Sequence, residues 1–345
     1  MKKELYGKTK DGKDVFCYTM SNKNGMEAYV IDFGAILLKV VVPDKNGIKK
    51  DVVLGCDCLD TYYENSNFFG STVGPSANRI AGAVAEIDGA IYHLDKNDGE
   101  NNLHSDIPHG MNKRLWEAEE NDNSVIFTNT LKDGEMGLPG NRSFTVTYTL
   151  TQENEVKIDY LVTSDHNTII NMTNHSYFNL AGHDSGNILN HELQLNASHY
   201  TPVVVGAIPT GEIATVIDTP LDFTKSKPIG KEIAADFEQL KLVNGYDHNF
   251  VTDNFDGKIR KIAEVTEPTT GRIMKVFTDL PGVQLYTGNW VDHAKGKESA
   301  IYEKRSGLCL ETQYYPDSIH HKNFPSVIFG PNKPYKSTTI YQFNK

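Results

Sequence analysis

The strongest constraint on the fold is an alternation of apolar and polar side chains along two neighbouring segments. Apolar residues occupy every second position from Phe144 to Leu150, and the pattern returns from Val156 to Val162. Successive side chains of a β-strand point to opposite faces of its sheet, so a period of two predicts half-buried strands. The polar residues 152–154 between the segments favour a turn. We therefore predict an antiparallel pair of strands here.

Short turn signals separate further strand-like segments. Asp88 and Gly89 lie between two such segments, residues 84–87 and 90–94. Asn-Gly pairs at 24–25 and 46–47 are weaker signals of the same kind. Asp-Gly and Asn-Gly suit two-residue hairpin turns because both central positions favour a positive φ. We expect antiparallel hairpins at these places.

Helical periodicity is scarce in this sequence. The best example is Lys231–Leu242, where Ile233, Phe237 and Leu240 share one helical face, and we predict a single short helix there. Strands and helices do not alternate along the chain, which argues against a doubly wound parallel sheet. We therefore predict one all-β domain over residues 1–345, a large antiparallel β-sandwich with few short helices.

Charge and hydropathy narrow the range of partners. The 34 basic and 45 acidic side chains give a net charge of −11, which disfavours binding to nucleic acids or anionic membranes. No segment approaches the roughly 20 apolar residues needed to span a bilayer. The opening residues lack the apolar region of a signal peptide, so we expect a cytoplasmic protein. We also expect reduced thiols at the four cysteines: Cys17, Cys56, Cys58 and Cys309.

Several well-known catalytic motifs are absent from the sequence. It contains neither G-x-G-x-x-G nor G-x-x-x-x-G-K-[ST], which disfavours dinucleotide-binding and P-loop enzymes. It also lacks H-E-x-x-H and G-x-S-x-G, the signatures of zinc proteases and serine hydrolases. No two histidines have the helical i, i+4 spacing beside a carboxylate, so we predict no metal site.

Polar and aromatic groups are concentrated in residues 171–179, directly after the apolar Ile169 and Ile170. A solvent-facing strand would usually carry Lys or Glu, and this segment has neither. His175 lies at its centre, and an imidazole that titrates near neutral pH suits acid–base catalysis. A hydrogen-bonded core histidine is an alternative that the composition leaves open.

Glu311 lies within an otherwise apolar strand. Leu308 and Leu310 alternate with Cys309 and Glu311, which places the carboxylate on the face opposite the leucines. A carboxylate in such a strand is solvated, paired or functional, and the local pattern does not choose among these roles.

Three smaller polar clusters occur elsewhere. They contain Asp247 and His248, Arg79 with Asn78, and His104. Each alone is equally consistent with a capped turn or a surface ion pair. Taken together with the many aromatic residues, they provide hydrogen-bonding groups for hydroxyls and flat faces for C–H groups. This combination is typical of a sugar-binding site.

In their order along the chain, these clusters resemble the aldose 1-epimerase (galactose mutarotase) family. The resemblance runs from end to end, and the sequence departs from the family pattern at Pro75-Ser76 and at Ser105-Asp106. The most specific segments are GPSANRI (74–80), NLH (102–104), DGEMGLPG (133–140), TNHSYFNL (173–180), GYDHNF (245–250), PGVQLYTGN (281–289) and LETQ (310–313).

The resemblance implies a function as well as the β-sandwich of that superfamily. It implies interconversion of the α and β anomers of free aldohexoses such as galactose and glucose, without a metal or organic cofactor. Glu311 would be the general base and His175 the general acid. We expect a monomer or weak homodimer whose partner is the free sugar. The residues expected to bind the sugar are Asn78, Arg79, His104, Asp247 and Gln284.

Three other functions remain open from the sequence. A glycoside hydrolase needs two carboxylates, for which Glu311 and Asp247 are available. A non-catalytic sugar-binding module would use the same polar and aromatic residues. An epimerase for sugar phosphates would need several cations, whereas Arg79 is the one arginine among the matched site residues.

Overall fold

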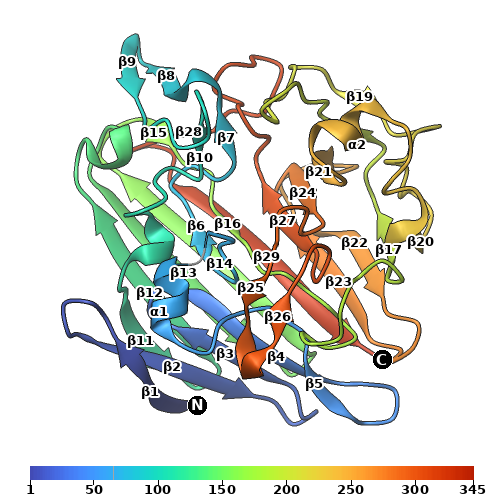
Figure 1. The fold of residues 1–345 in the computed structure, drawn as a ribbon. Helices are drawn as coiled ribbons and strands as arrows, with labels where there is room; N and C mark the ends of the chain where they lie inside the picture. Colours follow the sequence, from blue (N-terminus) through green and yellow to red (C-terminus); the bar gives the residue numbers. More distant parts are fainter. Residues whose placement is uncertain (65) are drawn as a thin grey trace.

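Three large antiparallel sheets contain most of the strand residues in the computed structural model, which describes residues 1–64 and 66–345 (Figure 1). The first sheet contains the amino-terminal strands in their order along the chain. They are β1 (Lys2–Lys8), β2 (Asp14–Ser21), β3 (Glu27–Ile31), β4 (Ile36–Pro43) and β5 (Lys49–Asp51). The turns at Asn24-Gly25 and Asn46-Gly47 join neighbouring strands of this sheet, and both glycines have a positive φ, as predicted.

The second sheet has nine strands and contains the alternating segments that the sequence singled out. Its order is β11 (Glu117–Asn121), β12 (Ser124–Leu131), β13 (Arg142–Leu150), β14 (Glu155–Ser164), β29 (Tyr335–Asn344), β23 (Ile273–Thr278), β22 (Arg260–Thr266), β17 (Glu192–Leu195) and β20 (Lys227–Pro228). The pairing of β13 with β14 runs from Arg142 opposite Ser164 to Leu150 opposite Val156, so the predicted antiparallel pair is confirmed.

The third sheet has five strands, three of which carry polar residues of the site. Its order is β19 (Ala214–Thr215), β18 (His199–Tyr200), β21 (Asp247–Val251), β24 (Gly282–Tyr286) and β27 (Cys309–Gln313). Every residue of β24 and β27 is buried, on both faces of the sheet.

Short strand pairs connect and cover the large sheets. The hairpin predicted at Asp88-Gly89 is present, with positive φ at both residues. The pairs are β7 (Arg79–Ile80) with β10 (Asn102–Leu103), β8 (Val84–Ile87) with β9 (Ala90–His93), β6 (Thr72–Val73) with β16 (Thr173–Asn174), β15 (Thr168–Ile169) with β28 (Ile328–Phe329), and β25 (Ala294–Lys295) with β26 (Ile301–Tyr302).

The helix predicted over Lys231–Leu242 is wrong in extent. The α-helix α2 covers only Glu238–Leu242, because Phe237 before it has an extended backbone. Ile233 and Phe237 still pack against the core, but they reach it from separate turns. The sequence pattern also missed α1 (Leu59–Glu64). The short 3₁₀ turns are η1 (Ala81–Ala83), η2 (Met111–Lys113), η3 (Glu135–Gly137), η4 (Ile229–Lys231) and η5 (Lys297–Ser299).

Apolar side chains from all three large sheets meet in one core, which confirms the predicted β-sandwich. Val30 comes from the first sheet, Val146 and Tyr341 from the second, and Leu285 and Leu310 from the third. On β24 and β27 the leucines face this core. The residues that alternate with them, including Gln284 and Glu311, therefore project from the other face of the third sheet.

The remaining predictions on composition concern thiols and membranes. No disulfide joins the cysteines among the described residues, and Cys56 and Cys309 are buried. Neither α-helix in the described ranges is long and apolar enough to cross a membrane.

Candidate active site

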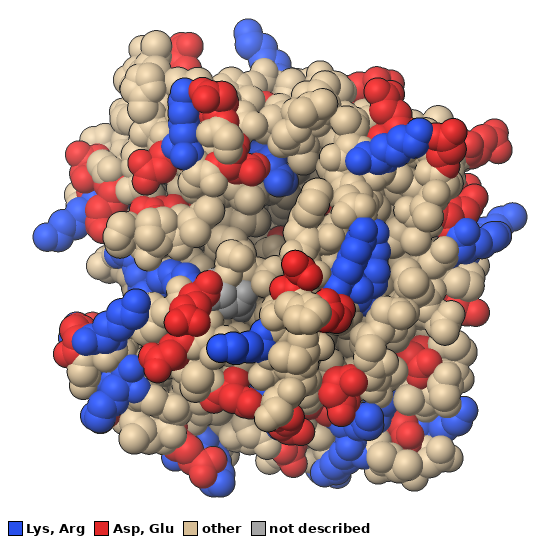
Figure 2. All heavy atoms as spheres, viewed as in Figure 1, with Lys and Arg blue, Asp and Glu red and all other residues tan. Residues whose placement is uncertain are grey.

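A pocket of about 200 Å³ opens near the centre of the face shown in Figure 2. All seven residues that the sequence analysis nominated line it, although they lie between positions 78 and 311 of the chain. The lining residues are Ser66, Asn67, Phe68, Asn78, Arg79, Leu103, His104, His175, Tyr177, Asp247, Gln284, Tyr286, Trp290 and Glu311.

The floor of the pocket is the outer face of the third sheet. Gln284 on β24 lies directly opposite Glu311 on β27, and Asn249 on β21 lies opposite Gln284. Asp247 and Tyr286 form the next row of the same face. Antiparallel register therefore places a row of polar side chains side by side, although they come from three separate segments.

His175 reaches the floor from a different part of the chain. The short strand pair β6–β16 precedes it, and its backbone is fixed by hydrogen bonds with Ser71 and Gly70. The imidazole stacks on Phe68 and Tyr177 and contacts the rings of His104 and Tyr286 edge-on. These aromatic walls hold the imidazole in one orientation and keep water away from it.

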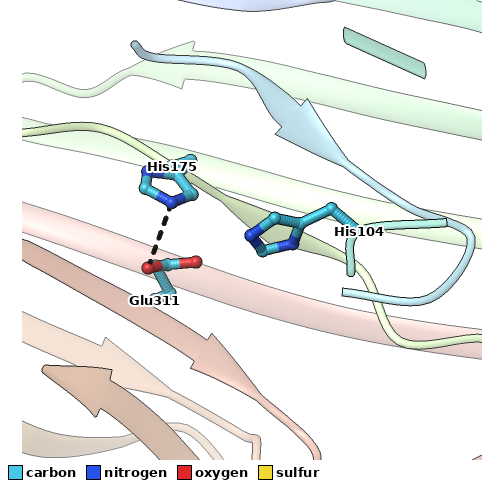
Figure 3. Close-up of side chains that lie close together, drawn as sticks. All are labelled: His104, His175 and Glu311. Atoms are coloured by element: carbon cyan, nitrogen blue, oxygen red, sulfur yellow. Dashed lines mark ion pairs between the residues drawn. The ribbon is translucent and has the colours of Figure 1, made fainter. Parts of the chain in front are cut away.

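His175 and Glu311 meet at the base of the pocket (Figure 3). The distance between His175 Nε2 and Glu311 Oε1 is 3.6 Å. The second carboxylate oxygen, Oε2, is buried and has no hydrogen-bond partner among the residues that the structure describes. Because buried polar atoms are normally hydrogen-bonded, this oxygen has an unmet capacity to accept a hydrogen bond.

Burial shifts the pKa values of this pair in opposite directions. His175 is 6% exposed and Glu311 is 2% exposed, and burial disfavours the charged form of each. Burial lowers the pKa of His175 to about 4. Burial, reinforced by the charge of Asp247, raises the pKa of Glu311 well above its usual range, while Arg79 opposes this shift. Burial therefore favours a neutral imidazole and a protonated carboxyl over the ion pair.

A chain of side-chain hydrogen bonds crosses the floor. Gln284 Nε2 donates to Asp247 Oδ1 over 2.7 Å, and Gln313 Nε2 donates to Gln284 Oε1 over 3.1 Å. Asn78 Nδ2 in turn donates to Gln313 Oε1 over 3.4 Å. Each amide is thereby fixed in orientation, so the remaining donors and acceptors have defined directions toward the pocket. Burial raises the pKa of Asp247, while Arg79 and the bond from Gln284 oppose the shift.

The opposite wall comes from the strand pair β7–β10. Leu103 lies opposite Arg79, and His104 follows at the end of β10. The backbone N–H of Asn78 donates to His104 Nδ1 over 3.0 Å. Burial lowers the pKa of His104 well below its usual value, and the charges of His175 and Arg79 add to the effect. A neutral imidazole that accepts at Nδ1 carries its proton on Nε2, so His104 is a hydrogen-bond donor.

The two places where the sequence departs from the family pattern contact each other. The backbone N–H of Ser76 donates to Ser105 Oγ over 2.8 Å, and Ser105 Oγ donates to Ser76 O over 3.1 Å. Both serines are buried, and neither lines the pocket. They lie behind Asn78 and His104 and hold the two loops of this wall together.

His104, His175 and Glu311 also place ligand atoms within 4.8 Å of one another, a grouping that the sequence analysis did not foresee. The hydrogen bond from Asn78 leaves the proton of His104 on Nε2, so this nitrogen has no lone pair for a metal. Two ligands would remain, fewer than the three protein ligands of a typical catalytic zinc site. A second group, Asp292 with His293 and Glu303, is exposed. The pocket group of His104, His175 and Glu311 is therefore better suited to hydrogen bonding with a ligand than to binding a metal ion.

Gln313 and the aromatic walls were not among the residues predicted from the sequence. Tyr286 lies two positions after Gln284 on β24, so strand alternation contained a signal for it, whereas Tyr177 lies beyond the end of β16. Phe68 and Trp290 have no such signal, because their position at the pocket depends on loops. Trp290 is 63% exposed at the rim.

Known proteins resemble this chain over most of its length. A family model described as aldose 1-epimerase matches residues 17–342. The galactose mutarotase of Bos taurus is 42% identical over 316 residues, which cover 91% of this chain and 90% of that protein. The aldose 1-epimerase of Escherichia coli (strain K12) is 37% identical over 337 residues, 96% of each chain.

A solved structure shows the same fold. The GalM/aldose epimerase homologue from C. elegans matches with a TM-score of 0.88 at 31% identity, over 95% of this chain and 98% of that one. The family model and the bovine and bacterial relatives each cover nine tenths of the chain or more. The chain belongs to the aldose 1-epimerase family.

Proposed function

We propose that this enzyme interconverts the α and β anomers of free aldohexoses such as galactose and glucose, with Glu311 as general base and His175 as general acid. One observation carries the proposal: a buried carboxylate and imidazole, 3.6 Å apart, lie at the base of a pocket lined by hydrogen-bonding and aromatic groups. The names of the relatives, galactose mutarotase and aldose 1-epimerase, support the same chemistry.

The reaction needs two proton transfers at neighbouring oxygens. The anomeric hydroxyl and the ring oxygen are both bonded to C1, so an acid and a base that serve them must lie close together. Glu311 takes the proton of the hydroxyl while His175 gives a proton to the ring oxygen. The bond between C1 and the ring oxygen breaks and C1 becomes an aldehyde. Rotation about the C1–C2 bond exposes its other face, and the ring closes with both proton transfers reversed.

The electrostatics of the pair suit such a reversal of roles. In the cyclic sugar complex the proton is on His175, and in the open-chain complex it is on Glu311. Burial lowers the pKa of His175 and raises that of Glu311, which stabilises the second arrangement relative to the first. Burial thus opposes the ordinary preference of the proton for the imidazole over the carboxylate, which suits a reaction that must run in both directions.

The other polar residues would bind the hydroxyls of the sugar. His104 offers an Nε2–H donor, and Asp247 retains an acceptor oxygen beyond its bond to Gln284. Asn78 and Arg79 would add donors from the opposite wall. The exposed ring of Trp290 and the walls of Tyr177 and Tyr286 would cover the C–H faces of the sugar. Since the chemistry consists of proton transfers between these groups, we expect no cofactor.

The charges in the pocket bear on the rival functions. Arg79 is the one lysine or arginine among the described residues that line it, and it is already paired with Asp98. A phosphate would need more cations than this. A hydrolase would need Asp247 as its second carboxylate, and that side chain is held by Gln284. A module that only binds sugars does not need an acid–base pair, and burying such a pair is unfavourable for folding.

We further propose that residues 1–345 act as one domain, because the site combines residues from position 78 to position 311. We also propose a monomer or weak homodimer in the cytoplasm. The absence of a disulfide among the described residues supports a reducing compartment, and the net charge of −11 disfavours nucleic-acid and membrane partners. Size-exclusion chromatography with light scattering would test the oligomeric state.

Polarimetry on freshly dissolved α-galactose and α-glucose tests the proposed function. We expect the optical rotation to reach equilibrium much faster with the protein than without it. Nitrophenyl galactoside should stay intact, and galactose 6-phosphate should react more slowly than galactose. Sugar binding without faster anomerisation would contradict the proposal in favour of a binding module. Release of nitrophenol would support a glycoside hydrolase instead. A preference for galactose 6-phosphate would support an epimerase for sugar phosphates.

A further inference from the structure

Arg79 is held from outside the pocket by a carboxylate that does not line it. Arg79 Nε donates to Asp98 Oδ2 over 2.7 Å. The arginine side chain is 15% exposed, and that of Asp98 is 34% exposed. This is the one side-chain hydrogen bond of the guanidinium within the described residues, so both terminal NH₂ groups remain available to a ligand.

The loop that carries Asp98 is itself fixed to the wall of the pocket. Asn97 exchanges two hydrogen bonds with the backbone of Leu103, and Asn102 Nδ2 donates to Asp95 O over 2.8 Å. Asp98 also forms a backbone bridge with Asn101. Since Leu103 is the register partner of Arg79, the loop and the arginine belong to one rigid unit. The ion pair is thus built into the fold, unlike a typical pair of mobile surface side chains.

The charge of Arg79 reaches the acid–base machinery. It lowers the pKa of Glu311 and that of Asp247, against the effect of burial. The charge of Asp98 acts on Asp247 in the opposite direction. At Asp247, Asp98 therefore partly cancels the positive field of Arg79.

We propose that Asp98 is a positioning and specificity-determining residue that acts through Arg79. It orients the guanidinium through Nε, and it cancels the arginine charge, so that the site accepts uncharged sugars and rejects anionic ones such as hexuronic acids. This inference rests on the proposed anomerase function.

Two substitutions separate orientation from charge, and the loop provides a matched control. Asp98→Ala removes both the hydrogen bond and the charge, whereas Asp98→Asn keeps an acceptor and removes only the charge. Asp95→Asn makes the same chemical change in the same loop. The Asp95 carboxylate is exposed and makes no hydrogen bond or ion pair within the described ranges.

In Asp98→Ala we expect the KM for galactose to rise about three- to fivefold with kcat nearly unchanged, because Arg79 contacts the sugar throughout the reaction. In Asp98→Asn the ratio of kcat/KM for galacturonate to that for galactose should rise about threefold or more. The acidic limb of the pH profile of kcat/KM should also move to lower pH in Asp98→Asn, because an unopposed Arg79 favours the ionised form of Glu311. Asp98→Glu should restore the wild-type limb, since it restores the charge.

A double-mutant cycle decides whether Asp98 acts through Arg79. In an Arg79→Gln background, Asp98→Ala should not raise the KM for galactose further, because there is no guanidinium left to orient. Additive effects in the cycle would overturn the inference. So would Asp98 variants, shown to be folded by thermal melting, that behave like Asp95→Asn. If either variant fails to fold, Asp98→Glu remains the test, and an altered acidic limb in it would also overturn the inference. The wild-type rate is measured first, so failure of the proposed function itself is recognised separately.

Discussion

Strands β13 and β27 both contact the core, but they are buried in different ways. On β13, buried residues such as Phe144 and Val146 alternate with more exposed ones. On β27 all five residues are buried, because the face opposite Leu310 lies beneath the pocket. That face carries Glu311 and Gln313, polar groups whose removal from water is unfavourable. One-sided burial serves stability, whereas two-sided burial that includes a polar face indicates a site maintained for its chemistry.

The largest effect on the rate of anomerisation should come from a substitution on the polar face of β27. Glu311→Gln should lower the rate of anomerisation by about 10²–10⁴-fold, because the amide cannot accept the proton. The free energy of unfolding should not fall, since the change removes a buried carboxylate with a raised pKa. Polarimetry and urea unfolding measure the two quantities.

His175→Asn provides the companion test of the acid, with a rate loss in the same range. Both variants should still bind galactose. A rate close to that of the wild type in either variant would remove that residue from the mechanism.

Substitutions on β13 should lower stability and leave activity almost unchanged. Phe144→Ala should lower the free energy of unfolding by about 3–5 kcal/mol through the cavity it leaves. Urea unfolding measures this loss, and kcat of the folded fraction should change less than about twofold. Ser143→Ala on the exposed face is the control, with an expected change within about 0.5 kcal/mol. Equal losses in both variants would contradict the role assigned to the alternating face.

Asp32 offers a buried carboxylate remote from the chemistry, for comparison with Glu311. It accepts hydrogen bonds from Phe16 N and Tyr18 Oη, and burial raises its pKa to about 6 from 3.8. The folded protein therefore favours the protonated form. The stability that this form provides is present below about pH 4 and is lost as the pH rises through 6.

Asp32→Asn should thus raise the free energy of unfolding by about 1–3 kcal/mol at pH 8, and by less at pH 5. Urea unfolding at the two pH values measures the difference, and the rate of anomerisation should not change. A gain that is the same at both pH values would show that the effect does not come from the titration of Asp32.

The smallest effect on activity is expected from a substitution at the rim of the pocket. The protein has two tryptophans, of which Trp116 is buried and Trp290 lies at the pocket. Galactose should change the tryptophan fluorescence of the wild type, and Trp290→Phe should abolish the change while KM shifts less than about twofold. A signal that persists in the variant would place the ligand away from this rim.

The sequence predicted the regular parts of the fold best. Alternation identified β13 and β14 because each has one buried face, and Asp88-Gly89 marked its hairpin because the turn is local. The helix expected from Lys231 was too long because a few apolar residues at helical spacing do not require a helix. Their contacts with the core are made from separate turns.

The site was harder to derive from local pattern. Strand alternation showed that Glu311 lies opposite the leucines, but its distance to His175 depends on how the third sheet packs against the segment after β16. The resemblance to a family was needed to group the seven residues. The proton on His104 Nε2 and the hold of Asp98 on Arg79 arise from loop geometry, for which local pattern has no signal.

The place of β29 in the nine-stranded sheet has a consequence for biosynthesis. This strand, Tyr335–Asn344, lies between β14 and β23 and pairs with both. While the chain is being translated, the two halves of the sheet have no strand to join them until residue 344 has left the ribosome. The nascent chain must therefore keep the exposed edges of β14 and β23 from pairing with other chains. We expect ribosome-bound chains that stop before β29 to be inactive and to depend on chaperones.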